Sequence, residues 1–299
     1  MGNNALQDYK AAMVDDQVVH IQEATKNDGE YTTPYPIGYD VFDNVMKGGA
    51  REGDLIILTG LSGSGKTTLS RNISVNYSKR KQPCLWFSYE EIIDNFYAKF
   101  KDMGATEKNF FIYVPKENTS GGVDWIEKKI IEGKEKENTK FIFIDSIDYL
   151  SPKNIKSSDQ QRIILKNICV QLKNVAKEQK VIIFLVAHVK KVQGREIELQ
   201  DIAESSGIYQ QADFVFAVTR KYDIKEDNTV NSKRKVEMIS DQSEIRMLKN
   251  RLTGEQPSMN FILKDNIIRP LSDDGILSLP EPLDDGEEEV SFEELNKLF

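Results

Sequence analysis

The chain has 299 residues, and its 39% hydrophobic content is enough for a substantial core in one large domain or two small ones. A net charge of −8 argues against a protein whose whole surface is covered by nucleic acid, but it leaves room for a local basic channel. No apolar run reaches the roughly 18 residues of a membrane span, so we expect a soluble, cytoplasmic protein without a membrane partner. Cys84 and Cys169 lie in apolar stretches, which predicts buried reduced thiols rather than a disulfide or a metal pair.

Residues 1–34 are polar with scattered apolar positions, which predicts a partly helical N-terminal arm followed by a linker. From residue 35 onward, short apolar runs alternate with longer amphipathic segments. The runs are LIILT, CLWFS, FFIYV, FIFID and VIIFLVA, and helices are expected from Lys66 and near 91–103, 123–136 and 159–179. The alternation predicts an α/β fold with crossover connections, in which a mostly parallel twisted sheet has helices on both faces.

The later runs FVFAV, IRMLK, MNFIL and IIRP have no helices between them that are long enough for crossovers, which predicts an antiparallel C-terminal extension. Residues 222–244 are charged and poor in large apolar side chains, and we expect a mobile loop or a hairpin there. The main domain is predicted to cover residues 35–271. Residues 272–299 form an acidic tail with apolar positions near helical spacing, which predicts a docking segment for a protein partner or a mimic of DNA charge, with a solvated tail as the alternative.

The octet GLSGSGKT stands between an apolar run and a helix-favouring stretch and fits the pattern G-x-x-x-x-G-K-[ST]. Glycines let several backbone N–H groups converge on one anion, and the positive end of the following helix adds to the attraction. The pattern predicts a site for ATP or another NTP with Mg²⁺, whereas an ordinary glycine turn is the alternative. The nucleotide-binding residues predicted from it are Gly60, Leu61, Ser62, Gly63, Ser64, Gly65, Lys66, Thr67 and Thr68, with Lys66 on the β and γ phosphates and Thr67 on the metal.

Three further polar residues follow apolar strands and are predicted to meet at the same sheet edge. Asp145 ends FIFID and is the predicted second metal ligand, although an aspartate at a strand end is also a common turn former. Glu90 in WFSYEE is the predicted base that orients water, while Glu91 is better explained as an acid at a helix N-terminus. His188 in FLVAHVKK is predicted to sense the γ-phosphate, with a structural histidine as the alternative.

Six segments in this order resemble the RecA-like ATPase domain of ring-forming replicative DNA helicases, of the DnaB, phage primase-helicase and Twinkle kind. They are IGYDVFDNVMKGGAREGDLIILTGLSGSGKTTL, WFSYEE, FIFIDSIDYL, VAHVKK, ESSGIYQQADFVFAV and LKNRLTGEQPSMNFIL. The resemblance covers about residues 35–270 and implies a RecA-like P-loop NTPase core. It also implies that Glu90 is the catalytic glutamate and that Lys249 and Arg251 reach the γ-phosphate of a neighbouring subunit.

Three departures from this family are visible: the arm is short, the acidic tail has no counterpart, and no primase or loader-binding segment precedes the ATPase. They leave open whether the protein primes or only unwinds DNA. A site that needs a neighbour's cation implies a homo-oligomer, and head-to-tail contacts can close into a ring, a hexamer in this family. The arm either packs on the next subunit or is a disordered leader.

Two loops are predicted to bind DNA phosphates at the inner wall of such a ring, with solvated surface lysines as the alternative. The first follows the strand of Asp145 and the second follows His188. The candidate residues are Lys153 and Lys156 in the first loop, and Lys190, Lys191, Gly194 and Arg195 in the second.

Taken together, the motifs predict an ATP-dependent replicative-type DNA helicase that translocates on single-stranded DNA and hydrolyses NTP at subunit interfaces, in a bacterial or phage-infected cell. A RecA/RadA-like recombinase or recombination mediator is the nearest rival. A clock-like signalling ATPase that binds no DNA is a rival of another class.

Overall fold

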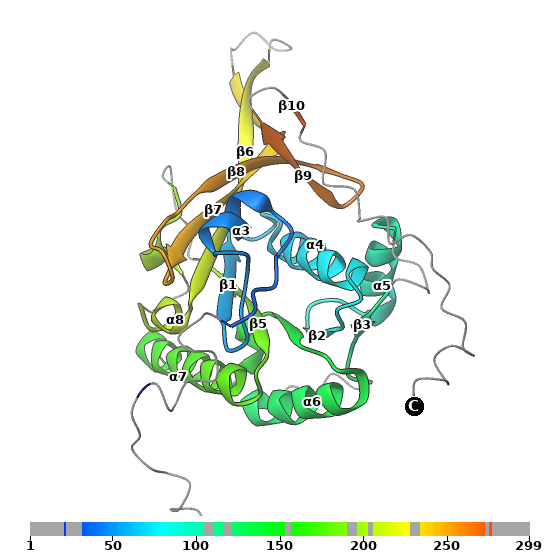
Figure 1. The fold of residues 1–299 in the computed structure, drawn as a ribbon. Helices are drawn as coiled ribbons and strands as arrows, with labels where there is room; N and C mark the ends of the chain where they lie inside the picture. Colours follow the sequence, from blue (N-terminus) through cyan, green and yellow to red (C-terminus); the bar gives the residue numbers. More distant parts are fainter. Residues whose placement is uncertain are drawn as a thin grey trace, which may run out of the picture. The chain divides into compact units, whose positions relative to one another are not determined.

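A computed structural model of the chain describes residue 21 and residues 32–104, 110–116, 121–152, 157–189, 196–202, 206–227, 234–272 and 275–276. The chain divides into two units, Met1–Pro34 and Tyr35–Phe299. In the first unit the description covers Ile21, which is helical, and residues 32–34. In the second unit it covers a twisted sheet with helices packed on both of its faces (Figure 1).

The sheet of the second unit has the strand order β10-β9-β8-β7-β6-β1-β5-β4-β2-β3. Its parallel part contains β6 (Phe214–Asp227), β1 (Leu55–Gly60), β5 (Ile182–His188), β4 (Phe141–Asp145), β2 (Cys84–Ser88) and β3 (Ile112–Tyr113). Its antiparallel part contains β7 (Arg234–Asn250), β8 (Ser258–Lys264), β9 (Ile267–Ser272) and β10 (Gly275–Ile276). The predicted fold, a mostly parallel sheet with an antiparallel C-terminal extension, is confirmed.

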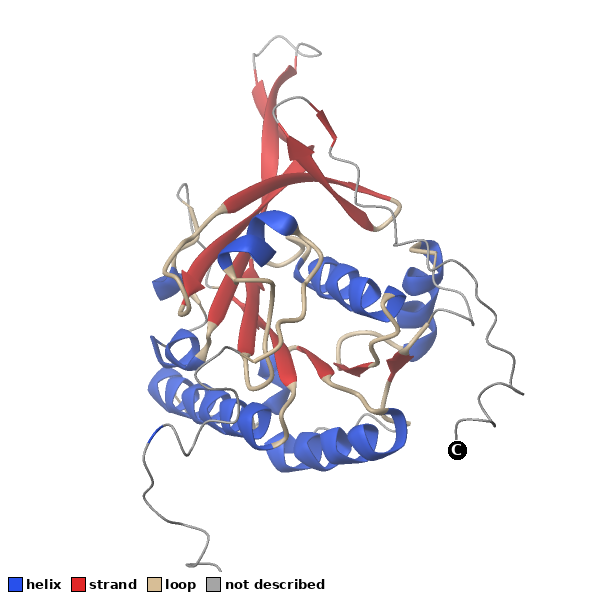
Figure 2. Ribbon diagram, viewed as in Figure 1, coloured by secondary structure: helices blue, strands red, loops and turns tan. Residues whose placement is uncertain are grey.

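Helices cover the two faces of the parallel part (Figure 2). On one face lie α3 (Asp40–Val45), α4 (Lys66–Lys79) and α5 (Ile93–Asp102), whose buried side chains share one apolar cluster. On the other lie α6 (Gly122–Glu137), α7 (Ser158–Glu178) and α8 (Ser206–Gln211), whose buried side chains belong to a second cluster. Two short 3₁₀ helices, η1 (Ile147–Leu150) and η2 (Leu199–Asp201), follow β4 and precede α8 respectively.

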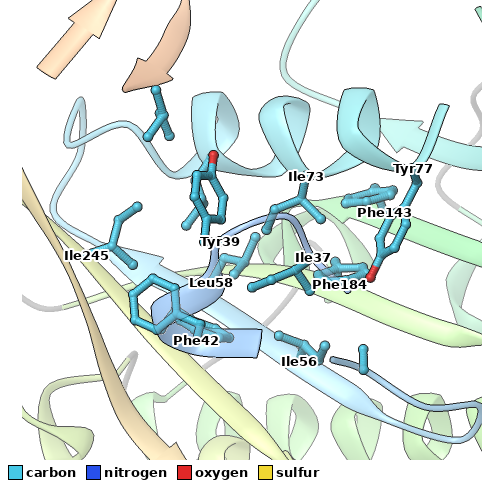
Figure 3. Packing of buried hydrophobic residues seen from close by; sticks show 14 of the residues in the cluster. Ile37, Tyr39, Phe42, Ile56, Leu58, Ile73, Tyr77, Phe143, Phe184 and Ile245 are labelled. Carbon is cyan, nitrogen blue, oxygen red and sulfur yellow. The ribbon is translucent and has the colours of Figure 1, made fainter. Parts of the chain in front are cut away.

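The strands of the parallel part are continuous apolar runs because both faces of the sheet are buried. Successive side chains of a strand point to opposite faces, and the two clusters divide accordingly. Ile56 and Leu58 of β1 belong to the cluster under α4, while Leu55 and Ile57 belong to the cluster under α7. Figure 3 shows Ile56 and Leu58 among the side chains of the first cluster. An alternating pattern is therefore missing from these strands, and their length and apolar content are what identifies them in the sequence.

Helix boundaries follow local chemistry. The side-chain oxygen of Ser157 accepts a hydrogen bond from the backbone N–H of Gln160, which caps the start of α7. Helix α6 ends where Asn138 adopts a left-handed conformation, a common way to stop a helix. Helix α4 begins directly after Gly65, so the phosphate loop runs straight into its first turn.

In the charged segment 222–244, the described residues 222–227 and 234–244 belong to the two strands of a hairpin, which was one of the two predicted forms. Strands β6 and β7 pair in antiparallel register from Tyr222 opposite Ile239 to Asp227 opposite Arg234. Antiparallel pairing satisfies the backbone N–H and C=O groups without a large apolar content, so the composition alone did not distinguish a hairpin from a loop.

The register of the parallel strands brings several polar residues to the same end of the sheet. Gly60 at the end of β1 lies beside His188 at the end of β5, and Ser88 at the end of β2 lies beside Asp145 at the end of β4. Ligands bind outside the carboxyl ends of the strands in sheets of this kind. This edge is therefore where the fold positions a binding site.

The two cysteines lie in different apolar clusters, Cys84 in β2 under α4 and Cys169 on the buried face of α7, and both are free and buried. The sheet between them excludes a disulfide. Within the part of the chain that the structure describes, no helix is long and apolar enough to cross a membrane.

Candidate nucleotide-binding and catalytic site

The phosphate loop, residues 60–67, connects β1 to α4 and needs glycine at two positions. Gly60 has φ 153°, and a Cβ there would lie 2.4 Å from Ser64 Oγ and 2.5 Å from the carbonyl oxygen of Val218. Gly65 has φ 108° at the position just before α4, where a side chain would be strained. The loop therefore packs tightly against β6 while its outer residues, Ser62 and Gly63, stay exposed.

The other predicted nucleotide-binding residues surround this turn. Lys66 Nζ donates hydrogen bonds to the carbonyl oxygens of Gly60 at 3.1 Å and Leu61 at 2.9 Å, so the side chain arches over the loop. Burial lowers the pKa of the Lys66 ammonium, and the carboxylate of Asp145 opposes that shift. Ser64 Oγ is buried and has no hydrogen-bond partner among the described residues. Thr68 lies in the first turn of α4, where its carbonyl oxygen accepts a hydrogen bond from Asn72 Nδ2 at 2.8 Å.

The two predicted metal ligands are in contact. The hydroxyl of Thr67 donates a hydrogen bond of 2.7 Å to Asp145 Oδ2, and Asp145 is 2% exposed. Its other oxygen, Oδ1, is buried and finds no hydrogen-bond partner in the described part of the chain, and burial raises the pKa of the carboxyl group. An unpaired buried carboxylate oxygen beside a hydroxyl fits a Mg²⁺ that takes its remaining ligands from phosphate oxygens and water.

Glu90 and Glu91 have different surroundings. Glu91 accepts hydrogen bonds from Arg71 at 2.7 Å and from Lys99 at 2.5 Å. Partial burial raises the pKa of Glu91, but the hydrogen bonds from Lys99 and Arg71 outweigh it and the pKa is lowered. Glu90 instead directs Oε1 to within 4.0 Å of His188 Nε2. Of the two acids, Glu90 is the one that faces the edge with the phosphate loop, and Glu91 is held in a structural ion-pair cluster.

His188 contacts an acid that the sequence reasoning missed. Its Nδ1 lies 2.7 Å from Oδ2 of Asp148 in η1. The hydrogen bond with His188 lowers the pKa of Asp148, outweighing the opposite effect of burial. The only signal in the sequence was a second aspartate in FIFIDSIDYL, three positions after Asp145. That spacing does not reveal a partner on a different strand.

Lys249 and Arg251 lie at the opposite end of the sheet from the phosphate loop. Lys249 Nζ donates to the carbonyl oxygens of Tyr209 at 2.8 Å and Ala212 at 2.7 Å, at the C-terminal end of α8. Arg251 donates to Asp213 Oδ1 at 3.1 Å. Asp213 in turn accepts a hydrogen bond from the backbone N–H of Leu55, the first residue of β1.

The chain therefore does not bring all of its predicted site residues together. The phosphate loop, Asp145, Glu90 and His188 lie at the carboxyl ends of the parallel strands. Lys249 and Arg251 lie at the opposite end of the sheet, near the start of β1. The predicted DNA-binding residues lie outside the described residues: Lys153, Lys156, Lys190, Lys191, Gly194 and Arg195.

The phosphate loop follows the central parallel strand β1, and the acid Asp145 ends β4, which is separated from β1 by β5. This arrangement defines a P-loop NTPase of the RecA-like kind. The fold and loop imply nucleotide binding with a divalent metal and NTP hydrolysis. The family described as AAA domain matches residues 41–194, more than half of the chain, and the chain belongs to this family.

Solved structures share the fold at low sequence identity. A DnaB-like replicative helicase, described with its interactions with primase, has a TM-score of 0.65 at 17% identity, over 88% of this chain and 70% of that chain. A second solved structure, described as an ATPase domain, has a TM-score of 0.63 at 19% identity, over 89% of this chain and 98% of that chain. The KaiC-like protein PH0186 of Pyrococcus horikoshii OT3 has a TM-score of 0.57 at 19% identity, over 81% of this chain and 100% of that chain. The chain has the RecA-like ATPase domain fold of replicative helicases, as predicted.

Curated relatives match about half of the chain. DNA repair protein RadA of Aquifex aeolicus (strain VF5) is 27% identical over 154 residues, which is 52% of this chain and 32% of the relative. The RadA of Rickettsia conorii (strain ATCC VR-613 / Malish 7) is 30% identical over 158 residues, 53% and 34% of the two chains. This chain thus spans about a third of the length of the RadA proteins it matches.

Proposed function

We propose that the chain is an ATP-driven DNA helicase that works as a ring and hydrolyses NTP where two subunits meet. The observation that carries this proposal is the separation, within one chain, of the phosphate loop from the two cations Lys249 and Arg251. Its fold, shared with a DnaB-like replicative helicase, supports the choice of a helicase among RecA-like motors.

The separation follows from strand pairing. Gly60 pairs with Val218 of β6, whereas the backbone N–H of Arg251 bonds to Asp213, level with Leu55 at the start of β1. Five strand residues at roughly 3.3 Å each amount to about 16 Å, which is longer than an extended arginine side chain. Arg251 therefore cannot reach a γ-phosphate bound to its own loop. A cation that acts in trans stabilises the charge of the transferred phosphoryl group in related NTPases, so we infer that a neighbouring copy completes the site.

The remaining parts of the proposal rest on the sequence. In a ring, the basic loops 153–156 and 190–195 of each copy would face one channel and bind the backbone of single-stranded DNA. We expect a hexamer, DNA of a bacterial or phage-infected cell as the substrate, and a protein partner for residues 272–299. The acidic outer charge is compatible with such a channel because the basic loops are concentrated in one place.

Two other functions remain candidates. The 27–30% identity to RadA proteins over about half of the chain favours a recombination or DNA repair motor. The fold is also shared with a KaiC-like protein, and a clock-like signalling ATPase that binds no DNA is the third candidate.

A mixing experiment tests the shared site. Lys66→Ala and Arg251→Ala chains are each expected to lose NTP hydrolysis. Mixed in equal amounts and allowed to exchange, they should regain activity, because roughly a quarter of the interfaces in a random ring combine an intact Lys66 with an intact Arg251. If the mixture stays as inactive as its parts, the two residues do not serve one site in trans.

A second experiment separates the three functions. The wild-type chain is studied with ATP and forked DNA by mass photometry and by strand separation. Closed rings that separate the strands support the helicase, and long filaments on DNA support the recombination motor. Rings that hydrolyse ATP equally well with and without DNA support the third candidate and would refute the helicase.

A further inference from the structure

Asp148 contacts His188 at the candidate catalytic edge and has no role assigned so far. We propose that Asp148 is a positioning residue for NTP hydrolysis, which holds the His188 ring so that its Nε2 faces Glu90. The inference rests on the proposed ATPase function, and it concerns the hydrolysis of NTP rather than the binding of DNA.

The contacts define the ring's orientation. His188 Nδ1 lies 2.7 Å from Asp148 Oδ2, and His188 Nε2 lies 4.0 Å from Glu90 Oε1. The two ring nitrogens thus face two different acids from two different elements, η1 and the end of β2. Asp148 is itself held in place, because the Ser146 hydroxyl donates a hydrogen bond to its Oδ2 at 3.3 Å.

The partner determines which nitrogen carries the proton. His188 lowers the pKa of Asp148, so Asp148 is ionised near neutral pH and its oxygens only accept hydrogen bonds. The proton of a neutral His188 ring must then sit on Nδ1, where it is donated to Asp148. Nε2 is left without a proton, and it becomes a hydrogen-bond acceptor beside the carboxylate of Glu90.

This arrangement decides what a neutral His188 can contact. A phosphate oxygen offers no proton, so it is not a hydrogen-bond partner for an unprotonated Nε2. The attacking water offers two protons, and two acceptors that converge from His188 and Glu90 would orient it. We therefore refine the predicted sensor role: neutral His188 responds to the γ-phosphate through the attacking water.

A stacked aromatic pair connects η1 to the segment that follows β2. The rings of Tyr89 and Tyr149 lie 5.7 Å apart at an interplanar angle of 13°. Tyr89 precedes Glu90 and Tyr149 follows Asp148, so this contact holds the backbone on each side of the histidine at a set distance. A shift of η1 would move Asp148 away from His188.

The first test reads the tautomer directly and needs no enzymatic activity. The chain has two histidines, so the variant His20→Gln leaves a single imidazole to follow by nitrogen NMR at alkaline pH. We expect the Nδ1–H form in that background and a shift to the Nε2–H form after Asp148→Ala. Asp159→Ala, which removes an exposed acid from α7, should leave the tautomer unchanged. An Nε2–H form in the background, or an unchanged tautomer after Asp148→Ala, overturns the proposal.

The second test is kinetic. Asp148→Asn should lower kcat roughly tenfold while the KM for MgATP stays within about twofold, as for other residues that orient a functional histidine. In a His188→Ala background the same change should have no further effect, because the ring it positions is gone. Equal losses in both backgrounds would refute the positioning role. If the wild-type chain hydrolyses ATP but does not separate DNA strands, the helicase function is refuted. The inference about Asp148 is unaffected by that result.

Discussion

Asp213 links three elements beneath the end of the sheet that is opposite the phosphate loop, and its charge is expected to be critical for stability. Its carboxylate pairs with Lys173 of α7 and with Arg251, and it accepts a hydrogen bond of 2.9 Å from the backbone N–H of Leu55. The side chains of Lys173 and Asp213 are only 9% and 10% exposed. The change Asp213→Asn keeps the size of the side chain and removes the charge.

The size of the stability loss follows from the charge on Lys173 that stays buried after the change. After the change, the Lys173 ammonium is still buried and keeps only neutral acceptors, such as the carbonyl oxygen of Gly53 at 2.6 Å. Breaking a buried ion pair in this way costs about 3–5 kcal/mol. A domain of this kind unfolds with a total of about 5–15 kcal/mol, so the loss is large. In thermal unfolding it corresponds to a fall in Tm of roughly 10 °C for a domain of this size.

Urea unfolding followed by circular dichroism measures the effect. A matched control is Glu132→Gln on α6, which breaks a solvent-exposed cluster with Lys129 and Lys136 and should leave the midpoint almost unchanged. The double change Asp213→Asn with Lys173→Met should recover much of the loss, since neither member of the buried ion pair then carries a charge. If Asp213→Asn unfolds at the same urea concentration as the Glu132→Gln control, the buried pair is not stabilising and the reasoning fails.

Three further outcomes are expected at the site. Gly60→Ala should weaken nucleotide binding and stability more than Gly63→Ala, because a Cβ at Gly60 meets two atoms within 2.5 Å while the space around Gly63 is open. Similar losses for the two variants, in binding calorimetry and in thermal melting, would contradict this. Glu90→Gln should lower kcat by about 10²-fold or more with an unchanged melting temperature. Glu91→Gln should instead lower stability. In the folded chain the pKa of Glu91 is lowered, so the carboxylate stabilises the fold at pH values above the unfolded pKa of about 4.3, and this stabilisation is lost as the pH falls further. Melting curves of the wild type and Glu91→Gln should therefore differ at neutral pH and converge in acid, and a constant difference would refute the ion-pair explanation.

Much of the fold was predictable because its signals are local. Short apolar runs rich in Ile, Val and Phe, such as FIFID and VIIFLVA, are typical of strands that are buried on both faces. The amphipathic stretches between them make crossovers, which allow a parallel sheet. The hairpin of β6 and β7 was harder, because its outer half lacks an apolar pattern and is stabilised by backbone pairing. The loop GLSGSGKT was clear for another reason: its glycines are required by backbone angles and close contacts that few other residues tolerate.

The candidate site was predictable only in part. Asp145 and Thr67 each stand in a motif, and the hydrogen bond between them forms because the end of β4 and the first turn of α4 meet at the same edge of the sheet. Asp148 lies in the segment FIFIDSIDYL but had no predicted role, and its importance comes from a contact with His188 at the end of β5, forty residues away. Likewise, nothing in the adjacent letters of Glu90 and Glu91 shows that Arg71 and Lys99 bind one and not the other.

The sequence by itself determined the class of protein, because a phosphate loop and its flanking strand and helix are contiguous and carry their own geometry. The tertiary structure decided which distant residues lie together in one site and which lie apart. Strand order brings His188 beside Gly60, and strand register carries Arg251 to the far end of the same sheet. These distances depend on how the strands are paired, and pairing is a property of the folded chain that no single segment contains.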